Sequence, residues 1–148
     1  MYRHIVIPTD GSELAEHGVA HGLALAKSLG AKVSVIFVVE PTLVPTSAPE
    51  TSGRFLEAVA RYAELRKEQA TSVLDRAAKA AKEAGVSCET IQVENGQPHQ
   101  AIIAAAEDKG CDLIVMSSHG RSGLSMLLIG SVTNKVLTNA KTPVLVCQ

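Results

Sequence analysis

Short runs of branched apolar residues alternate along the chain with longer stretches in which apolar residues recur every three or four positions. The short runs have the length and composition of buried β-strands. They occupy His4–Pro8, Val33–Val39, Val86–Val93, Asp112–Met116 and Pro143–Cys147. Because strands separated by helices need crossover connections, they pair in parallel. The pattern predicts a doubly wound α/β fold with one five-stranded parallel sheet flanked by helices.

The longer stretches have the period of amphipathic helices. They predict helices over Leu14–Leu29, Arg54–Ala84 and Gln97–Asp108, and a last helix that begins after Ser131. Charges between Arg61 and Arg76 mix in sign at helical spacing, which is typical of a solvated face and predicts no partner. The segment Pro41–Gly53 lacks a periodic pattern, and its Pro, Ser and Thr residues favour an irregular loop near the functional site.

The composition fits one ordinary domain over residues 1–148, because 46% of the residues are hydrophobic and can bury a substantial core. The formal net charge of -1 supplies no excess positive field for nucleic acid or for an anionic membrane. No apolar run approaches the roughly 18 residues of a membrane span, and the N-terminal run is too short for a secretory signal. We therefore expect a cytoplasmic protein. The three cysteines form no CxxC pair, which argues against a zinc clamp or a redox dithiol.

The strongest candidate for a ligand site follows the fourth predicted strand. In a doubly wound sheet, ligands bind beyond the carboxyl ends of the strands, where the winding direction reverses. The segment Ser117–Gly123 is rich in Ser and Gly, and its successive amides can form an anion nest. Gly130 and Ser131 precede the last helix, with Ser131 as the expected N-cap and the first-turn amides directed at an anion. We expect the loop between Ser117 and Ser131 to hold phosphate.

Two common nucleotide motifs are absent from the chain. There is no GxxxxGK(S/T) sequence, and no GxGxxG follows the first predicted strand. Their absence disfavours a P-loop NTPase and a dinucleotide-binding enzyme. Within the candidate loop, His119 and Arg121 carry donors suited to phosphate oxygens, although a His or Arg in a loop is often simply solvated.

An aspartate follows the first predicted strand, in the sequence Pro8-Thr9-Asp10-Gly11-Ser12. Its carboxylate lies at the same edge of the sheet as the candidate loop, where it can accept hydrogen bonds from a ribose or hold magnesium through water. In the alternative interpretation, Asp10 caps the first helix and Glu13 completes a capping box. The spacing favours neither interpretation.

The strings IVIPTDGS, SSHGRSGLSMLLIGSVTNKVL and TPVLV together resemble the universal stress proteins of the ATP-binding type. The motif of that family, G-x2-G-x9-G-(S/T), matches from Gly120 to Gly130 and Ser131, and Ser117 stands where the motif has its first glycine. The resemblance extends over nearly the whole chain. It implies a Rossmann-like fold of the adenine nucleotide alpha hydrolase type, and it implies ATP as the ligand, with or without Mg²⁺.

The resemblance also implies a role for individual residues. Phosphate contacts would come from Gly120, Gly130 and Ser131, and Asp10 would lie on the ribose side. The pocket for adenine and sugar would be lined by Pro8, Thr9, Val38, Val39, Met116 and Val132. At Ser117, the small hydroxyl side chain is compatible with binding and can itself donate a hydrogen bond to a phosphate.

Three functions agree with these residues: a nucleotide-sensing regulator, a slow ATP hydrolase, and a dimeric interaction module that binds no nucleotide. We favour the regulator, because phosphoryl transfer needs a base or a water-positioning residue and a cation clamp. The candidate site offers only Asp10, His119 and Arg121, without a P-loop lysine. We therefore assign no catalytic residue and no dedicated metal ligand.

The last predicted strand, Pro143–Cys147, is almost continuously apolar. In the common flavodoxin-like strand order it lies at the edge of the sheet. An apolar edge strand pairs readily with another strand. The sequence therefore predicts a homodimer through this strand, which the family resemblance also implies.

Overall fold

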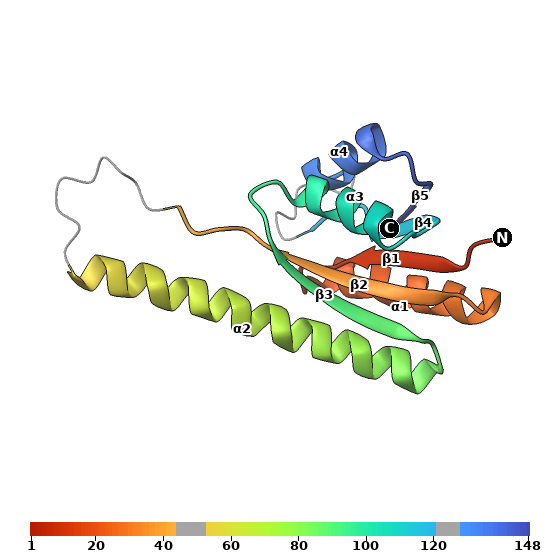
Figure 1. The fold of residues 1–148 in the computed structure, drawn as a ribbon, viewed down its shortest axis with the longest axis horizontal. Helices are drawn as coiled ribbons and strands as arrows, with labels where there is room; N and C mark the ends of the chain where they lie inside the picture. The colour runs from red at the N-terminus through yellow and green to blue at the C-terminus, as the bar shows by residue number, and fades with distance from the viewer. Residues whose placement is uncertain (44–52, 121–127) are drawn as a thin grey trace.

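The predicted strands form one parallel sheet in the computed structural model, which describes residues 1–43, 53–120 and 128–148 (Figure 1). The strands are β1 (His4–Pro8), β2 (Lys32–Val39), β3 (Cys88–Glu94), β4 (Leu113–Ser117) and β5 (Val144–Cys147). The helices are α1 (Glu13–Leu29), α2 (Gly53–Ala84), α3 (Pro98–Asp108) and α4 (Ser131–Asn139). The predicted fold class is confirmed. Of the expected loop Pro41–Gly53, residues 44–52 lie outside the described residues, and Gly53 already belongs to α2.

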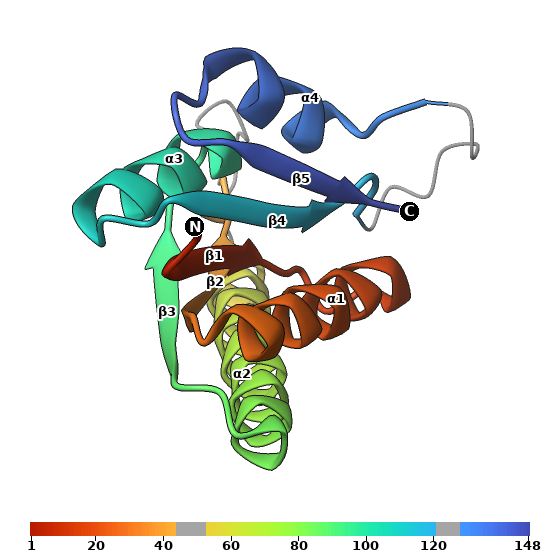
Figure 2. The same cartoon turned by 90° about the vertical axis from the view of Figure 1, so that its right-hand side faces the viewer.

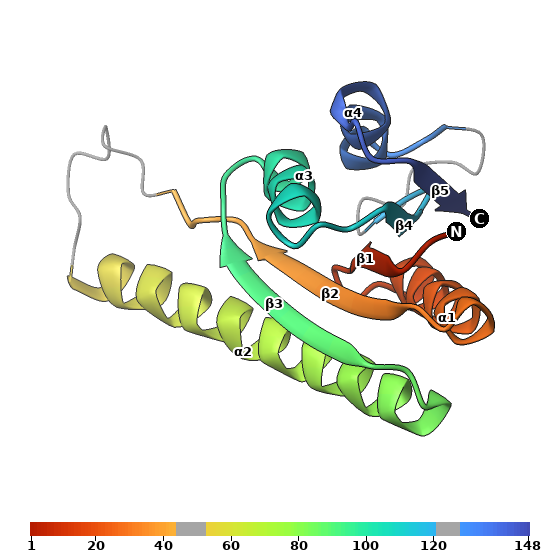
Figure 3. The ribbon, with the colours of Figure 1, turned by 45° about the vertical axis from the view of Figure 1, so that its right-hand side comes forward.

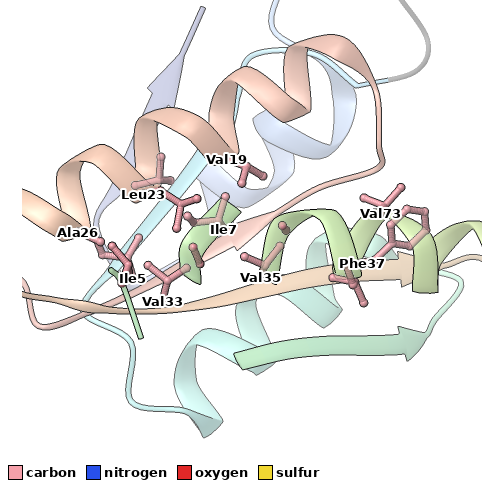
Figure 4. Packing of buried hydrophobic residues seen from close by; sticks show 14 of the residues in the cluster. Ile5, Ile7, Val19, Leu23, Ala26, Val33, Val35, Phe37 and Val73 are labelled. Carbon is pink, nitrogen blue, oxygen red and sulfur yellow. The ribbon is translucent and has the colours of Figure 1, made fainter. Parts of the chain in front are cut away.

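The helices cover the sheet in two layers, with α1 and α2 on one face and α3 and α4 on the other (Figures 1 and 3). Alternation along β2 supplies both cores, because successive side chains point to opposite faces of the sheet. Val33, Val35 and Phe37 pack with α1 and α2, as Figure 4 shows, whereas Ile36 and Val38 belong to the core under α3 and α4.

The strand order is β3-β2-β1-β4-β5. The chain winds outward from β1 to β2 and β3, and then returns to the other side of β1 for β4 and β5. The winding direction therefore reverses between β1 and β4, which is where such sheets bind ligands. The order differs from the flavodoxin-like one, but β5 lies at the sheet edge as predicted (Figure 2).

Helix α1 begins with a side-chain cap from Ser12. The Oγ of Ser12 accepts a hydrogen bond from the amide of Ala15 at 3.2 Å. The interpretation of Asp10 as the cap, with Glu13 completing a capping box, is wrong. The Oδ1 of Asp10 instead accepts from the amide of Ser12 at 2.9 Å, so this carboxylate stabilises the turn that precedes the helix.

Helix α2 packs on the sheet with its C-terminal half only. Its buried residues are Ala70, Val73, Leu74, Ala77 and Ala81. The N-terminal half extends beyond the carboxyl ends of β2 and β3 (Figure 1). Within the described ranges, no helix is both long enough and apolar enough to span a membrane.

A polar network around the buried His4 and Ser34 lies at the amino end of the sheet. His4 contacts the Oγ of Ser34 through Nε2 at 2.8 Å and the carbonyl of Lys109 through Nδ1 at 3.1 Å. Ser34 donates to Glu89 at 2.9 Å, and the Nζ of Lys109 lies 3.0 Å from the second carboxylate oxygen of Glu89. The network joins β1, β2 and β3 to the end of α3 on the side of the sheet opposite to the carboxyl ends of the strands.

Candidate functional site

A cavity of about 310 Å³ opens at the carboxyl ends of β1 and β4. Cavities that bind small ligands have volumes from roughly 300 to 1,000 Å³. Side chains from both helical layers and from three strand ends contribute to its wall. The described lining residues are Pro8, Thr9, Asp10, Ala15, Ile36, Val38, Glu40, Arg66, Pro98, Ile102, Met116, Ser117, His119, Gly120, Gly130, Ser131, Val132 and Thr133.

One part of the wall is apolar and continues the core under α3 and α4. Ile36 and Met116 are buried members of that core, and Val38 and Val132 are partly buried residues packed against it. Because these side chains already belong to a packed core, the apolar wall is preformed. It suits a flat apolar group such as a base.

The opposite part of the wall is polar and comes from the predicted phosphate loop. The amide of Gly130 donates to the carbonyl of Ser118 at 2.7 Å, and the hydroxyl of Thr133 donates to the carbonyl of Ser117 at 2.9 Å. The amide of Ser118 donates to the carbonyl of Cys147 at 2.8 Å. The first two bonds hold the start of the loop beside the first turn of α4, and the third joins it to the end of β5.

The N-terminus of α4 lies at this polar wall. Its N-cap is Gly130, without a side-chain hydrogen bond, and Ser131 is the first helical residue, so the prediction of Ser131 as N-cap is wrong. A Cβ on Gly130 would come within 3.2 Å of the Ser118 carbonyl oxygen, so the close approach of the two segments favours glycine here. The first-turn amides have no acceptor within the helix and carry the positive end of its dipole, which favours an anion.

His119 is buried at the polar wall, with 9% of its surface exposed. Its Nδ1 lies 2.9 Å from the hydroxyl of Ser118, and its Nε2 is buried without a hydrogen-bond partner among the described residues. The burial of His119 argues against the interpretation, allowed by the sequence, that this residue is simply solvated. A buried polar atom without a partner costs about 1–3 kcal/mol, so His119 carries an unsatisfied ring nitrogen close to the cavity.

Asp10 connects the end of β1 to the phosphate loop. A Cβ on Gly120 would come within 2.5 Å of the Asp10 Oδ2, so the carboxylate packs closely against the backbone of Gly120. Asp10 also lines the cavity. The carboxylate is therefore within the site, at the junction of the polar wall with the end of β1.

Ser117 adopts an ordinary strand conformation as the last residue of β4. No residue other than glycine has a positive φ in the described ranges, so serine causes no backbone strain at this position. Its hydroxyl donates to the carbonyl of His119 at 2.7 Å. The hydroxyl therefore stabilises the loop itself, whereas the sequence suggested a donor to phosphate.

Most of the residues predicted for the site line this one cavity. They are Pro8, Thr9, Asp10, Val38, Met116, Ser117, His119, Gly120, Gly130, Ser131 and Val132. Val39 does not line it, because alternation along β2 turns its side chain to the core with α1 and α2. Arg121 lies outside the described residues.

Several lining residues were not predicted from the sequence. Glu40 directly follows β2, so the rule about carboxyl ends of strands could have found it. Arg66 comes from α2, inside the charge run that the sequence assigned to a solvated face. Pro98 and Ile102 come from the first turns of α3, and only the packing of this helix brings them to the cavity. No group of three or more potential metal ligands gathers anywhere in the described ranges.

The family model of the universal stress proteins matches residues 1–148. The chain is 38% identical over 148 residues to universal stress protein MJ0531 of Methanocaldococcus jannaschii, covering 100% of this chain and 83% of that protein. It is 33% identical over 155 residues to universal stress protein YxiE of Bacillus subtilis, with 100% of both chains covered.

Solved structures show the same relationship. The structure of MJ0577 from Methanocaldococcus jannaschii aligns with a TM-score of 0.75 at 31% identity, covering 99% of this chain and 95% of that chain. A universal stress protein in complex with cAMP aligns with a TM-score of 0.69 at 26% identity, covering 99% and 97%. UspA of Lactobacillus plantarum has a TM-score of 0.83 at 19% identity over 99% and 98%, a likeness of fold alone. The chain belongs to the universal stress protein family.

Proposed function

We propose that this protein binds an adenine nucleotide, ATP in the first place, and acts as a nucleotide-responsive stress regulator in the cytoplasm. The observation that carries the proposal is the N-terminus of α4, which has no side-chain cap and is hydrogen-bonded to the loop after β4 at one wall of the cavity. The apolar wall supports the assignment of the adenine base, because a flat apolar group packs well against apolar side chains. A family member in complex with cAMP supports the adenine nucleotide class.

The nucleotide would lie across the carboxyl edge of the sheet. The backbone at Gly120, Gly130 and Ser131 would hold the phosphates, with His119 as an additional donor. The ribose would lie beside Asp10, and the base would lie between Val38, Met116 and Val132. Magnesium, where it accompanies the phosphates, would contact Asp10 through water and neutralise phosphate charge.

We assign no catalytic residue to this site. The described charged or titratable side chains at the cavity are Asp10, Glu40, Arg66 and His119, and they include no lysine that could clamp the transferring phosphate. Binding without rapid turnover suits a regulator, because the bound nucleotide then reports its cellular concentration.

Titration calorimetry of the purified protein with ATP, ADP and AMP, with and without Mg²⁺, tests this proposal. Mass spectrometry of copurifying small molecules identifies the ligand independently. In the variant Gly130→Ala, the added methyl group would press on the Ser118 carbonyl and displace the start of α4. We expect its affinity for ATP to fall at least about tenfold, a difference of about 1.4 kcal/mol.

The matched control is Gly53→Ala, because a Cβ at Gly53 would meet no atom within 4 Å. This variant should bind ATP like the natural chain. If millimolar ATP, ADP and AMP give neither heat nor a thermal shift, the protein is not a nucleotide-binding regulator. Equal affinities of both glycine variants would remove α4 from the site.

We also propose that the protein is a homodimer through β5. In the described part of the chain, β5 pairs with β4 alone and leaves its other edge open. Leu145 is 43% exposed there, which places apolar surface beside unpaired backbone. A second copy of β5 would cover both.

A further inference from the structure

One cationic side chain at the cavity has no role in the proposed function. Arg66 reaches the cavity from α2, and the other described lining residues come from the strands, from loops or from the remaining helices. Arg66 is half-buried and precedes the fully buried Ala70 by four residues. Because residues four positions apart share one helix face, Arg66 continues the face of α2 that packs on the sheet.

The position of Arg66 along α2 places it at one end of the cavity. The neighbouring Lys67 lies 3.9 Å from Glu94, the last residue of β3, so this turn of α2 is level with the carboxyl ends of β3 and β2. Glu40, which follows β2, lines the same cavity. The described start of the phosphate loop, Ser117–Gly120, follows β4 on the far side of β1. Arg66 is therefore at the end of the cavity away from the proposed phosphate contacts.

The guanidinium of Arg66 is only partly engaged. Its NH1 donates to the Oε1 of Gln69 at 3.1 Å, and it makes no ion pair with any described residue. Three other cations of α2 do have acidic partners: Arg61 with Glu68, Lys67 with Glu94, and Arg76 with Glu16. A guanidinium has five N–H donors and a flat face that stacks on aromatic rings. Among the described residues, Arg66 is thus held through one nitrogen, which leaves its other donors for a ligand.

We infer that Arg66 is a base-contacting residue whose guanidinium packs over the purine ring of the bound nucleotide. The inference rests on the proposed nucleotide site and adds a specificity determinant to it. A purine offers a larger aromatic face than a pyrimidine, so this contact favours purine nucleotides. It also makes α2 part of the binding site, so that both helical layers of the fold touch the ligand.

The test compares Arg66→Ala with the natural chain by calorimetry, using AMP and ATP. Because both ligands carry the same base, we expect the substitution to weaken both by the same factor, about three- to tenfold. The preference for AMP over UMP should shrink by a similar factor. Arg66→Lys should remain weak, because an ammonium group lacks the flat face. Arg61→Ala is the matched control and should bind like the natural chain, since Arg61 is on the same helix but not at the cavity.

Three outcomes would overturn the inference. If Arg66→Ala binds AMP and ATP as the natural chain does, Arg66 is not a contact, although the nucleotide site stands. If the variant loses far more affinity for ATP than for AMP, Arg66 contacts phosphate and not the base. If the natural chain binds no nucleotide, the proposed function fails and the inference fails with it. Thermal unfolding midpoints of the variants confirm that each is folded.

Discussion

At the scale of single residues, Ser117 is the departure from the family motif that the structure explains. Its hydroxyl stabilises the loop through a 2.7 Å bond to the His119 carbonyl, and its backbone has no positive φ that glycine would relieve. We therefore expect Ser117→Gly to destabilise the protein by about 1–2 kcal/mol, from the lost hydrogen bond and the added backbone freedom. Urea unfolding measures this change.

The same substitution should not tighten ATP binding, although it restores the motif. Ser117→Ala separates the two contributions, because it removes the hydrogen bond and retains the Cβ. It should therefore fall between the natural chain and the glycine variant in stability. An ATP affinity raised tenfold in Ser117→Gly would show that the serine obstructs the ligand.

Most of the residues that line the cavity were predictable, and the exceptions have local causes. The sequence suggested Asp10 as the cap of α1, and the hydrogen-bond geometry shows that Ser12, two residues later, is the cap. At α4 the sequence suggested Ser131 as the N-cap, and the structure has the cap one residue earlier, at Gly130. Arg66 could not be identified, because a charge pattern along a helix does not reveal which turn overhangs a cavity.

At the scale of elements, the polar network at the amino end of the sheet makes stability depend on pH. Burial lowers the pKa of His4, and the charge of Lys32 lowers it further, while Glu89, Asp112 and the Lys109 carbonyl act in the opposite direction. The folded protein therefore binds a proton at His4 less readily than the unfolded chain does. Stability is fully present above the ordinary histidine pKa of 6.5 and is lost as the pH falls below it.

Two carboxylates of this region act in a lower pH range. Hydrogen bonds from Lys109 and Ser34 lower the pKa of Glu89. Burial acts to raise the pKa of Asp112, but hydrogen bonds from the amides of His4 and Arg3 lower it by more. Both carboxylates stabilise the fold above their ordinary pKa values of 4.5 and 3.8, and this contribution is lost as the pH falls through the lowered values.

We therefore predict that the free energy of unfolding falls between pH 7 and pH 5 because of His4, whose pKa is lowered in the folded protein. In His4→Gln, this part of the pH dependence should disappear while the loss in the more acidic range remains. Urea unfolding at a series of pH values measures both. An unchanged slope between pH 7 and pH 5 in the variant would assign the effect to another group.

The elements themselves were predictable because their periodicity is strong, but their bounds were less so, and the start of the third strand shows why. Val86 was expected to begin the third strand, which starts at Cys88. The amide of Val86 instead donates to the carbonyl of Ala81 at 2.9 Å, and Gly85 adopts a φ of 73°. Val86 thus belongs to the C-terminal cap of α2, where a buried apolar residue after the glycine is common. An apolar residue fits the start of a strand and the C-terminal cap of a helix equally well, so the sequence alone does not distinguish them.

At the scale of the whole molecule, the site depends on how the chain winds. Pairing of β1 with β4 brings Asp10 to Gly120, although these residues are far apart in the sequence. Alternating strands and helices predict that such a junction exists. They do not determine how α2 packs along the sheet, and this packing brings Arg66 level with the strand ends at the cavity.

The proposed dimer also concerns the whole molecule, because an open apolar edge strand pairs readily with a strand of another molecule. Pairing of β5 with its copy would continue the sheet across a two-fold axis and bury Leu145. In Leu145→Glu, two like charges would lie near each other across that axis. We expect the dimer dissociation constant to rise at least about tenfold. Folding should stay intact, because the side chain is 43% exposed. Leu65→Glu, at a residue 46% exposed on α2, is the matched control and should remain dimeric. Sedimentation velocity measures the oligomeric state of each variant. If the natural chain sediments as a monomer at all concentrations, the proposed dimer through β5 does not form.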